Sequence, residues 1–112
     1  MSTKLTRESK VVLALANIEK ALKTLNLWSN GTNRPDESAF LSQTPFFLDT
    51  MSFEQWLEFV LIPRFYQIIR NQDKLPQKVV IHTYAMEIYR GKWQEYKELI
   101  SSLTEFDKLF EN

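Results

Sequence analysis

The stretch PFFLDTMSFEQWLEFVLIPRFYQII, residues 45–69, decides the fold prediction. Within it, Gln55 follows Ser52 at the third position, which is the spacing of a capping box. Met51 before the cap and Trp56 four residues after it occupy the positions of a hydrophobic staple. The sequence therefore predicts that a helix begins at Ser52.

This central helix is apolar around most of its circumference as far as Ile69. A surface helix keeps a narrower apolar stripe, so we expect this one to be covered on most sides. A membrane span is not predicted, because it needs roughly 20 apolar residues and Glu58, Pro63 and Arg64 interrupt the run. Pro63 lacks an N–H group, so we expect a kink there. The kink either wraps the helix around the core or turns the freed Phe59 carbonyl toward a pocket or partner.

Four charged residues lie within or beside this apolar run. Because an unpaired buried charge is costly, we hypothesise that Asp49 caps or salt-bridges the helix start. Arg64 is expected to meet a carboxylate or a loop carbonyl. Glu54 and Glu58 share a helix face, but we expect them on the solvated exterior, because catalytic carboxylates need a pocket that shifts their pKa values.

Three motifs in order, residues 46–51 (Phe-Phe-Leu-Asp-Thr-Met), 56–57 (Trp-Leu) and 62–64 (Ile-Pro-Arg), resemble the YqcC-like family of small uncharacterised bacterial proteins. The resemblance extends from about Leu5 to Phe110. It implies an all-helical bundle and no established activity. Members often appear genetically beside a tRNA pseudouridine synthase, which suggests an association with that pathway.

The length of 112 residues predicts one domain, residues 1–112. Fourteen basic and fourteen acidic residues give no net charge, so general attraction to nucleic acid or to an anionic membrane is not expected. The chain has no cysteine, and charged residues interrupt its first ten positions, unlike a secretory signal. We therefore expect a cytoplasmic protein.

The remaining chain favours three further helices, near residues 5–26, 82–90 and 92–110, with Gly91 as a C-terminal cap between the last two. The predicted fold is an all-α, four-helix up-and-down bundle. Residues 27–51, which we call the strap, are expected to pack over the bundle through aromatic rings rather than act as a mobile lid. The apolar positions of the first helix follow three- and four-residue steps: Val11, Leu15, Ile18, Leu22, Leu25. The last helix shows the same steps: Tyr96, Ile100 (or Leu99), Leu103, Phe106, Phe110. Its acidic side chains are expected on the opposite, solvated side: Glu95, Glu98, Glu105, Asp107.

Recognised catalytic and ligand-binding motifs are missing from the sequence. Gly31 and Gly91 are the only glycines, and neither belongs to a phosphate-binding loop. The single histidine, His82, excludes a His–His metal pair and is interpreted as a turn or helix-start residue. A Ser–His dyad stays open as an alternative, although no serine is marked as its partner. We predict no catalytic residue, no metal ligand and no cofactor.

Charge alternates along the chain. Residues 1–34 carry a net charge of +4, residues 35–62 carry −5, residues 63–92 carry +4 and residues 93–112 carry −3. Such segments often pair with one another in a bundle. If the basic side chains converged instead, their common face could contact RNA phosphates: Arg7, Lys10, Lys20, Lys23, Arg64, Arg70, Lys74, Lys78.

The sequence favours a non-enzymatic interaction module that binds a protein partner or a small apolar ligand. The alternative is an accessory factor in tRNA modification that contacts RNA or the modifying enzyme. An enzyme is least favoured, because no nucleophile, base and orienting group can be named together. The candidate binding surface consists of the strap end and nearby helix positions: Pro45, Phe46, Phe47, Asp49, Trp56, Pro63, Arg64.

Overall fold

A computed structural model describes residues 6–111 of the chain, and every regular element in that range is helical. The prediction of an all-helical fold is therefore confirmed. The elements are α1 (Arg7–Thr24), the 3-10 turns η1 (Glu37–Leu41) and η2 (Pro45–Phe47), α2 (Phe53–Trp56), the π turn η3 (Leu57–Leu61), α3 (Ile62–Arg70), α4 (His82–Ile88) and α5 (Lys97–Lys108).

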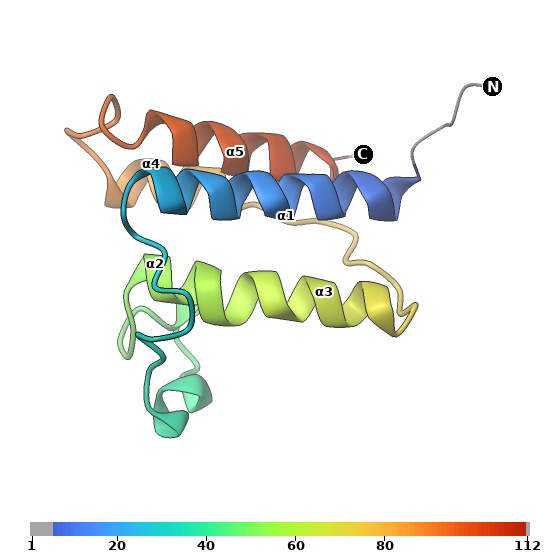
Figure 1. Cartoon of the computed structure of the whole chain (residues 1–112), viewed down its shortest axis with the longest axis horizontal. Helices are drawn as coiled ribbons and strands as arrows, with labels where there is room; N and C mark the ends of the chain where they lie inside the picture. The colour runs from blue at the N-terminus through green and yellow to red at the C-terminus, as the bar shows by residue number, and fades with distance from the viewer. Residues whose placement is uncertain (1–5, 112) are drawn as a thin grey trace.

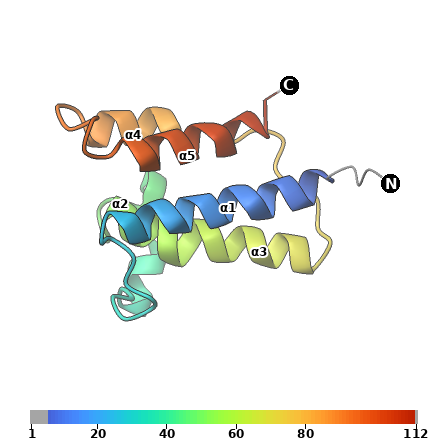
Figure 2. The ribbon, with the colours of Figure 1, turned by 45° about the horizontal axis from the view of Figure 1, so that its top comes forward.

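The elements α2, η3 and α3 follow one another as a single rod, which lies beside α1 and runs in the opposite direction (Figure 1). Helix α5 packs along α1, and the short α4 packs against α5 (Figure 2). The strap leaves the end of α1 and projects away from the helices before it returns to the start of the rod, with the turquoise segment around residue 40 farthest out.

Helix α1 has a local signal at each end. The Thr6 side chain accepts a hydrogen bond from the Ser9 N–H, as an N-cap residue does. At the other end Asn26 takes a φ of 60°, and the Leu27 N–H donates to the Leu22 carbonyl at 2.8 Å. This is a Schellman motif with asparagine in the left-handed position. Between the caps, four of the predicted apolar positions of this helix face the core: Val11, Leu15, Ile18, Leu22.

The central rod begins with the predicted capping box, in which Ser52 accepts from the Gln55 N–H and the Gln55 side chain accepts from the Ser52 N–H. The expected proline kink takes a different form. The chain makes a π turn just before Pro63, where the Ile62 N–H donates to the Leu57 carbonyl five residues earlier. The backbone keeps right-handed helical angles on both sides of this turn. The π turn contains one residue more than a turn of α-helix, and this extra residue makes room for Pro63, which has no N–H to donate. The rod therefore continues through the proline.

The core lies between α1, the rod and α5. Phe65 of α3 contacts Phe106 and Phe110 edge-on, with ring centroids 5.1 and 5.6 Å apart. Large aromatic side chains contribute strongly to burial and therefore to the attachment of α5 to the rod. The largest side chains that are essentially inaccessible to solvent are Phe53, Phe106, Phe110, Leu15, Ile18, Leu22, Leu57, Leu99, Leu103 and Val11.

The last two helices are shorter than the sequence predicts. Helix α4 ends at Ile88, and Gly91 adopts a φ of 83° in the turn that follows. The indole N–H of Trp93 donates to the Met86 carbonyl and holds this connection against α4, so α5 begins only at Lys97. No helix in the described part of the chain is both long and apolar enough to cross a membrane.

Candidate protein-docking surface

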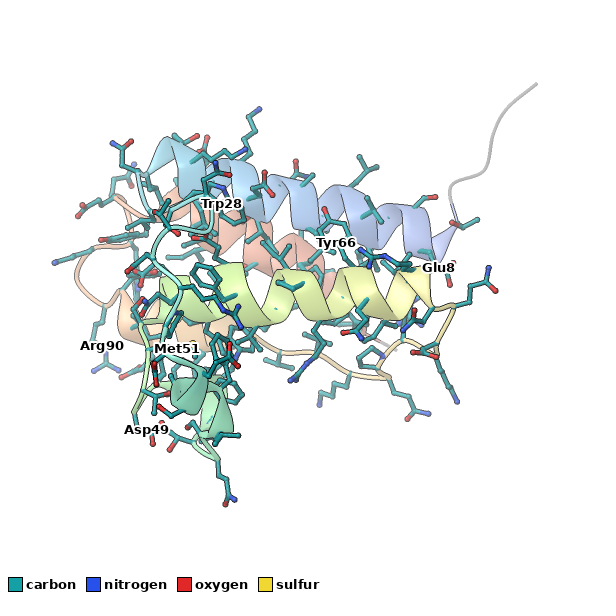
Figure 3. All side chains as sticks on the ribbon, turned by 60° about the horizontal axis from the view of Figure 1, so that its bottom comes forward. Glu8, Trp28, Asp49, Met51, Tyr66 and Arg90 are labelled. Carbon is teal, nitrogen blue, oxygen red and sulfur yellow. The ribbon has the colours of Figure 1, made fainter. Side chains whose placement is uncertain are left out.

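The strap has a small core of its own. Ala39, Met51 and Val60 are buried together, and half-buried Phe40, Phe47 and Trp56 pack around them. The Thr50 hydroxyl donates to the Ala39 carbonyl at 2.8 Å and ties the two ends of the projecting segment together. Figure 3 shows Met51 near the rod and Asp49 farther out on this projection. The strap is thus a folded extension of the rod.

Two adjacent aromatic residues of the strap have unusual backbone conformations. Phe46 and Phe47 have φ values of 57° and 51°, in the left-handed region that bulky residues rarely enter. Such conformations cost on the order of 1–3 kcal/mol per residue and require compensating contacts. Phe46 packs toward the main core, with its ring centroid 4.8 Å from Trp56, whereas Phe47 packs on the small core of the strap. The reversal thus places neighbouring rings in two different clusters.

The predicted binding residues divide into two groups. Phe46 and Trp56 are half-buried and contribute to the main core. Pro45, Asp49, Pro63 and Arg64 are exposed, and Phe47 is half-buried. A shallow hollow of about 210 Å³ unites Phe47, Pro63 and Arg64 with four further residues: Phe40, Phe59, Val60, Gln67.

The hypothesis for the two charged residues was wrong. Asp49 neither caps the rod nor forms an ion pair within residues 6–111; its carboxylate accepts a hydrogen bond from the Ser42 hydroxyl. This bond lowers the pKa of Asp49 below its usual value, while Asp49 itself is exposed. Arg64 lies at the rim of the hollow and has no ion pair among the described residues. Its guanidinium group is therefore available to a partner.

The most exposed large apolar side chain among the described residues is Leu41, at 80%. It ends η1, which together with the preceding Asp36 forms a segment that we call the knob (residues 36–41). The Arg34 guanidinium pairs with Glu37 at 3.0 Å and lies over the Phe40 ring, 4.5 Å from its centroid. Leu41 was not among the predicted binding residues, because it lies in an irregular stretch that has no periodicity to mark it.

Glu58 lies inside the protein rather than on the predicted exterior, with only 6% of its surface exposed. Its carboxylate accepts three hydrogen bonds, from the Ser29 N–H and hydroxyl and from the Gly31 N–H. Glu54 is half-buried and accepts a hydrogen bond from the Tyr89 hydroxyl at 2.8 Å. The two carboxylates therefore fasten different parts of the chain.

Asp107 is the second buried carboxylate, at 2% exposure, and the prediction that it faces solvent was wrong. It accepts hydrogen bonds from the Ile81 and His82 N–H groups and contacts His82 Nδ1 at 2.8 Å. These bonds, from a residue of α5 that lies about 25 positions later in the sequence, cap the start of α4. His82 is therefore at a helix start, as predicted. The adjoining cavity of about 440 Å³ has no serine in its lining, so it offers no Ser–His dyad.

Two of the basic side chains named above are engaged at opposite ends of α1. Arg7 donates to the Leu109 carbonyl at the start of α1, whereas Lys23 pairs with Glu19 near its end. Sixteen helical residues separate Arg7 from Lys23, which corresponds to about 24 Å. In the described part of the chain, no three His, Cys, Asp or Glu side chains are grouped closely enough to hold a metal ion.

Comparison with known proteins gives a consistent set of relatives. The DUF446 family model, described as tRNA pseudouridine synthase C, matches residues 10–109. An uncharacterised protein of Haemophilus influenzae is 36% identical over 98 residues, which cover 88% of this chain and 90% of that protein. The uncharacterised protein YqcC of Escherichia coli is 30% identical over 106 residues, 95% of each chain.

Two further similarities concern structure and a longer protein. A solution NMR structure of protein YqcC from E. coli has a TM-score of 0.81 and 30% identity, and the match covers 95% of this chain and 89% of that one. A tRNA pseudouridine synthase C from Pectobacterium carotovorum subsp. carotovorum is 38% identical over 73 residues. Those residues are 65% of this chain but only 19% of the synthase.

Proposed function

Because this chain belongs to the DUF446 family of uncharacterised bacterial proteins, we propose that it is a non-enzymatic, cytoplasmic interaction module that docks a protein partner on its strap. The observation that carries the proposal is the exposed Leu41 at the end of a packed, hydrogen-bonded projection. The residue before it, Phe40, lines the hollow that contains Phe47, Pro63 and Arg64. Surfaces that combine an apolar anchor with an available arginine are typical of protein interfaces.

Several ionisable side chains are hydrogen-bonded to other parts of the chain, which supports a binding role rather than catalysis. Glu58 accepts three hydrogen bonds that hold the loop around Ser29 in place. Asp107 Oδ2 accepts two, from the N–H groups at the start of α4, and also contacts His82 Nδ1. The Tyr89 hydroxyl is committed to Glu54. A catalytic group must be free to exchange protons or bonds with a substrate. Glu58 and Tyr89 are occupied within the fold, whereas Asp107 Oδ1 is buried without a hydrogen-bond partner among the described residues.

We also propose that the helices form an up-and-down four-helix bundle whose role is to carry the strap. The opposed directions of α1 and the rod, and of α1 and α5, support this topology. The short α4 takes the remaining position, where Asp107 fastens its first residues. A rigid scaffold of this kind positions a docking surface at little entropic cost on binding.

The alternative function is an accessory role in tRNA modification, through contact with RNA or with the modifying enzyme. The description of the family model and the relative named tRNA pseudouridine synthase C are consistent with it. In that relative, four-fifths of the polypeptide lies outside the region that resembles this chain. A module joined to an enzyme in one polypeptide could act on the same reaction.

Purification of the tagged full-length chain from native extract, with recovered protein and RNA both identified, tests these functions. We expect one protein to be recovered in a constant ratio with the wild type and to be lost with Leu41→Ser. Leu13→Ser is the matched control, because Leu13 is 54% exposed on α1, away from the strap. Recovery of RNA alone would favour the accessory role, and turnover of a recovered metabolite would favour an enzyme. Equal recovery with Leu41→Ser would contradict docking on the strap.

A further inference from the structure

The apolar end of the knob is adjacent in sequence to a residue that lines the hollow. Leu41 is 80% exposed and directly follows Phe40, which lines the hollow with Phe47 and Phe59. A single exposed leucine is common on protein surfaces and needs no explanation. Phe40 connects Leu41 to a hollow that is lined by three phenylalanines, and exposed apolar patches mark interaction sites.

The charges around this patch are mostly negative. From residue 35 to residue 50 the chain contains three carboxylates and no lysine or arginine. All three carboxylates are exposed, on Asp36, Glu37 and Asp49. Arg34 pairs with Glu37, which leaves Asp36 and Asp49 without a cation among the described ion pairs, and Arg64 lies at the rim of the hollow. Such a surface repels phosphate groups and attracts a basic protein surface.

The knob is held in one conformation before any partner binds. The Asp36 side chain accepts hydrogen bonds from the N–H and the hydroxyl of Ser38, which cap η1. On the other side, Ala39 is buried in the small core of the strap and its carbonyl is bonded to Thr50. Because little chain freedom is left to lose, binding through Leu41 requires little further ordering.

We infer that the knob inserts Leu41 into an apolar pocket of a protein partner whose rim carries lysine or arginine, with Asp36 and Asp49 facing those cations. This inference rests on the proposed function, since it names the chemistry of the partner that the strap docks. It excludes RNA as the occupant of the knob, because the carboxylates there oppose the phosphate backbone.

Site-specific photocrosslinking in cells tests the inference. The full chain carries benzoylphenylalanine in place of Leu41, and mass spectrometry sequences the peptide to which it becomes attached. We expect an apolar peptide flanked by lysine or arginine. Placing the same probe at Leu13 on α1 is the control, and it should not give that peptide.

The peptide's parent protein is then titrated with the purified chain and with Asp36→Lys/Asp49→Lys. The wild-type affinity should fall as salt rises, and the double variant should bind about 10-fold or more weakly. Glu105→Lys, at an exposed position of α5, should bind like the wild type. A crosslinked peptide rich in acidic residues, a crosslink to RNA or undiminished binding of the double variant would overturn the inference. A crosslink from Leu13 but none from Leu41 would overturn the proposed strap function as well.

Discussion

Glu58 and Ser29 are joined by two hydrogen bonds, of 2.9 Å from the Ser29 N–H and 2.8 Å from its hydroxyl, across 29 positions of sequence. A third bond, from the Gly31 N–H at 2.8 Å, completes the shell of the carboxylate. Glu58 lies in the π turn of the rod, and Ser29 lies where the strap leaves α1. One buried side chain therefore fixes the direction in which the strap departs.

Replacing Glu58 with alanine should lower the free energy of unfolding by about 2–4 kcal/mol, because it leaves buried donors without an acceptor. Glu58→Gln keeps one acceptor oxygen and should lose about half as much. Urea denaturation followed by circular dichroism measures both. Glu87→Ala on α4 removes an exposed carboxylate and should change stability by less than about 0.5 kcal/mol. A loss for Glu58→Ala no larger than this control would contradict the buried arrangement.

Asp107 makes a prediction about α4. Asp107→Ala removes the acceptor for the Ile81 and His82 N–H groups and should destabilise the protein by about 2–4 kcal/mol. Native-state hydrogen exchange should show those two amides opening more often, since no side chain of the N-cap residue replaces the lost bonds. Glu105→Ala on the same helix is the matched control, because its carboxylate is exposed and pairs only with Lys108. Unchanged protection at residues 81 and 82 would refute this role.

Tyr89 predicts a loss of stability in alkali. Burial, and then the neighbouring Glu54 carboxylate, raise the pKa of the Tyr89 phenol far above its usual value. The unfolded chain releases this proton near pH 10, whereas the folded protein retains it. The free energy of unfolding is therefore unaffected by this group below pH 10, and above pH 10 it falls by about 1.4 kcal/mol per pH unit.

Urea unfolding between pH 8 and pH 11 measures this effect. Tyr89→Phe lacks the titrating group and should show a shallower decline than the wild type above pH 10. Near neutral pH the same variant should lose about 1 kcal/mol with the hydrogen bond to Glu54. Parallel alkaline profiles for the two proteins would show that Tyr89 ionises equally in the folded and unfolded states.

The Ser42–Asp49 bond predicts a local titration. Because the Ser42 hydroxyl lowers the pKa of Asp49, Ser42→Ala should move that pKa back toward about 3.9. Because this pKa is lowered in the folded protein, the ionised Asp49 stabilises the strap at pH values above the usual carboxyl pKa. The stabilisation is lost as the pH falls through the lower pKa of the folded state. Carbon-detected NMR of the Asp49 carboxyl measures the shift. Ser38→Ala, which touches Asp36 instead, should leave the Asp49 curve unchanged.

The sequence predicted the features that depend on residues close together in the chain. The capping box at Ser52 and Gln55 is present, and the predicted apolar positions of α1 face the core. Both features depend on residues no more than four positions apart. The sequence also indicated the aromatic character of the strap. These patterns are readable because the period of a helix determines which positions meet.

The features that the sequence did not predict depend on distant donors or on context. Glu58 and Asp107 read as exterior residues because their partners lie 25 to 29 positions away. The conformation of Phe46 and Phe47 contradicts the local preference of bulky residues and exists only because two clusters hold their rings. Leu41 could not be placed either, since nothing near it in sequence says which way η1 points.

The π turn requires a fixed number of residues in this part of the rod. Removing one residue between Leu57 and Leu61 would restore a regular α-helix and rotate everything before it by about 100° relative to α3. The strap would then emerge on a different side of the molecule, and the buried carboxylate would miss its loop. Relatives of this chain should therefore vary in length in the strap or the connections but keep the residue count of this segment, and designed deletions here should be far more harmful than substitutions.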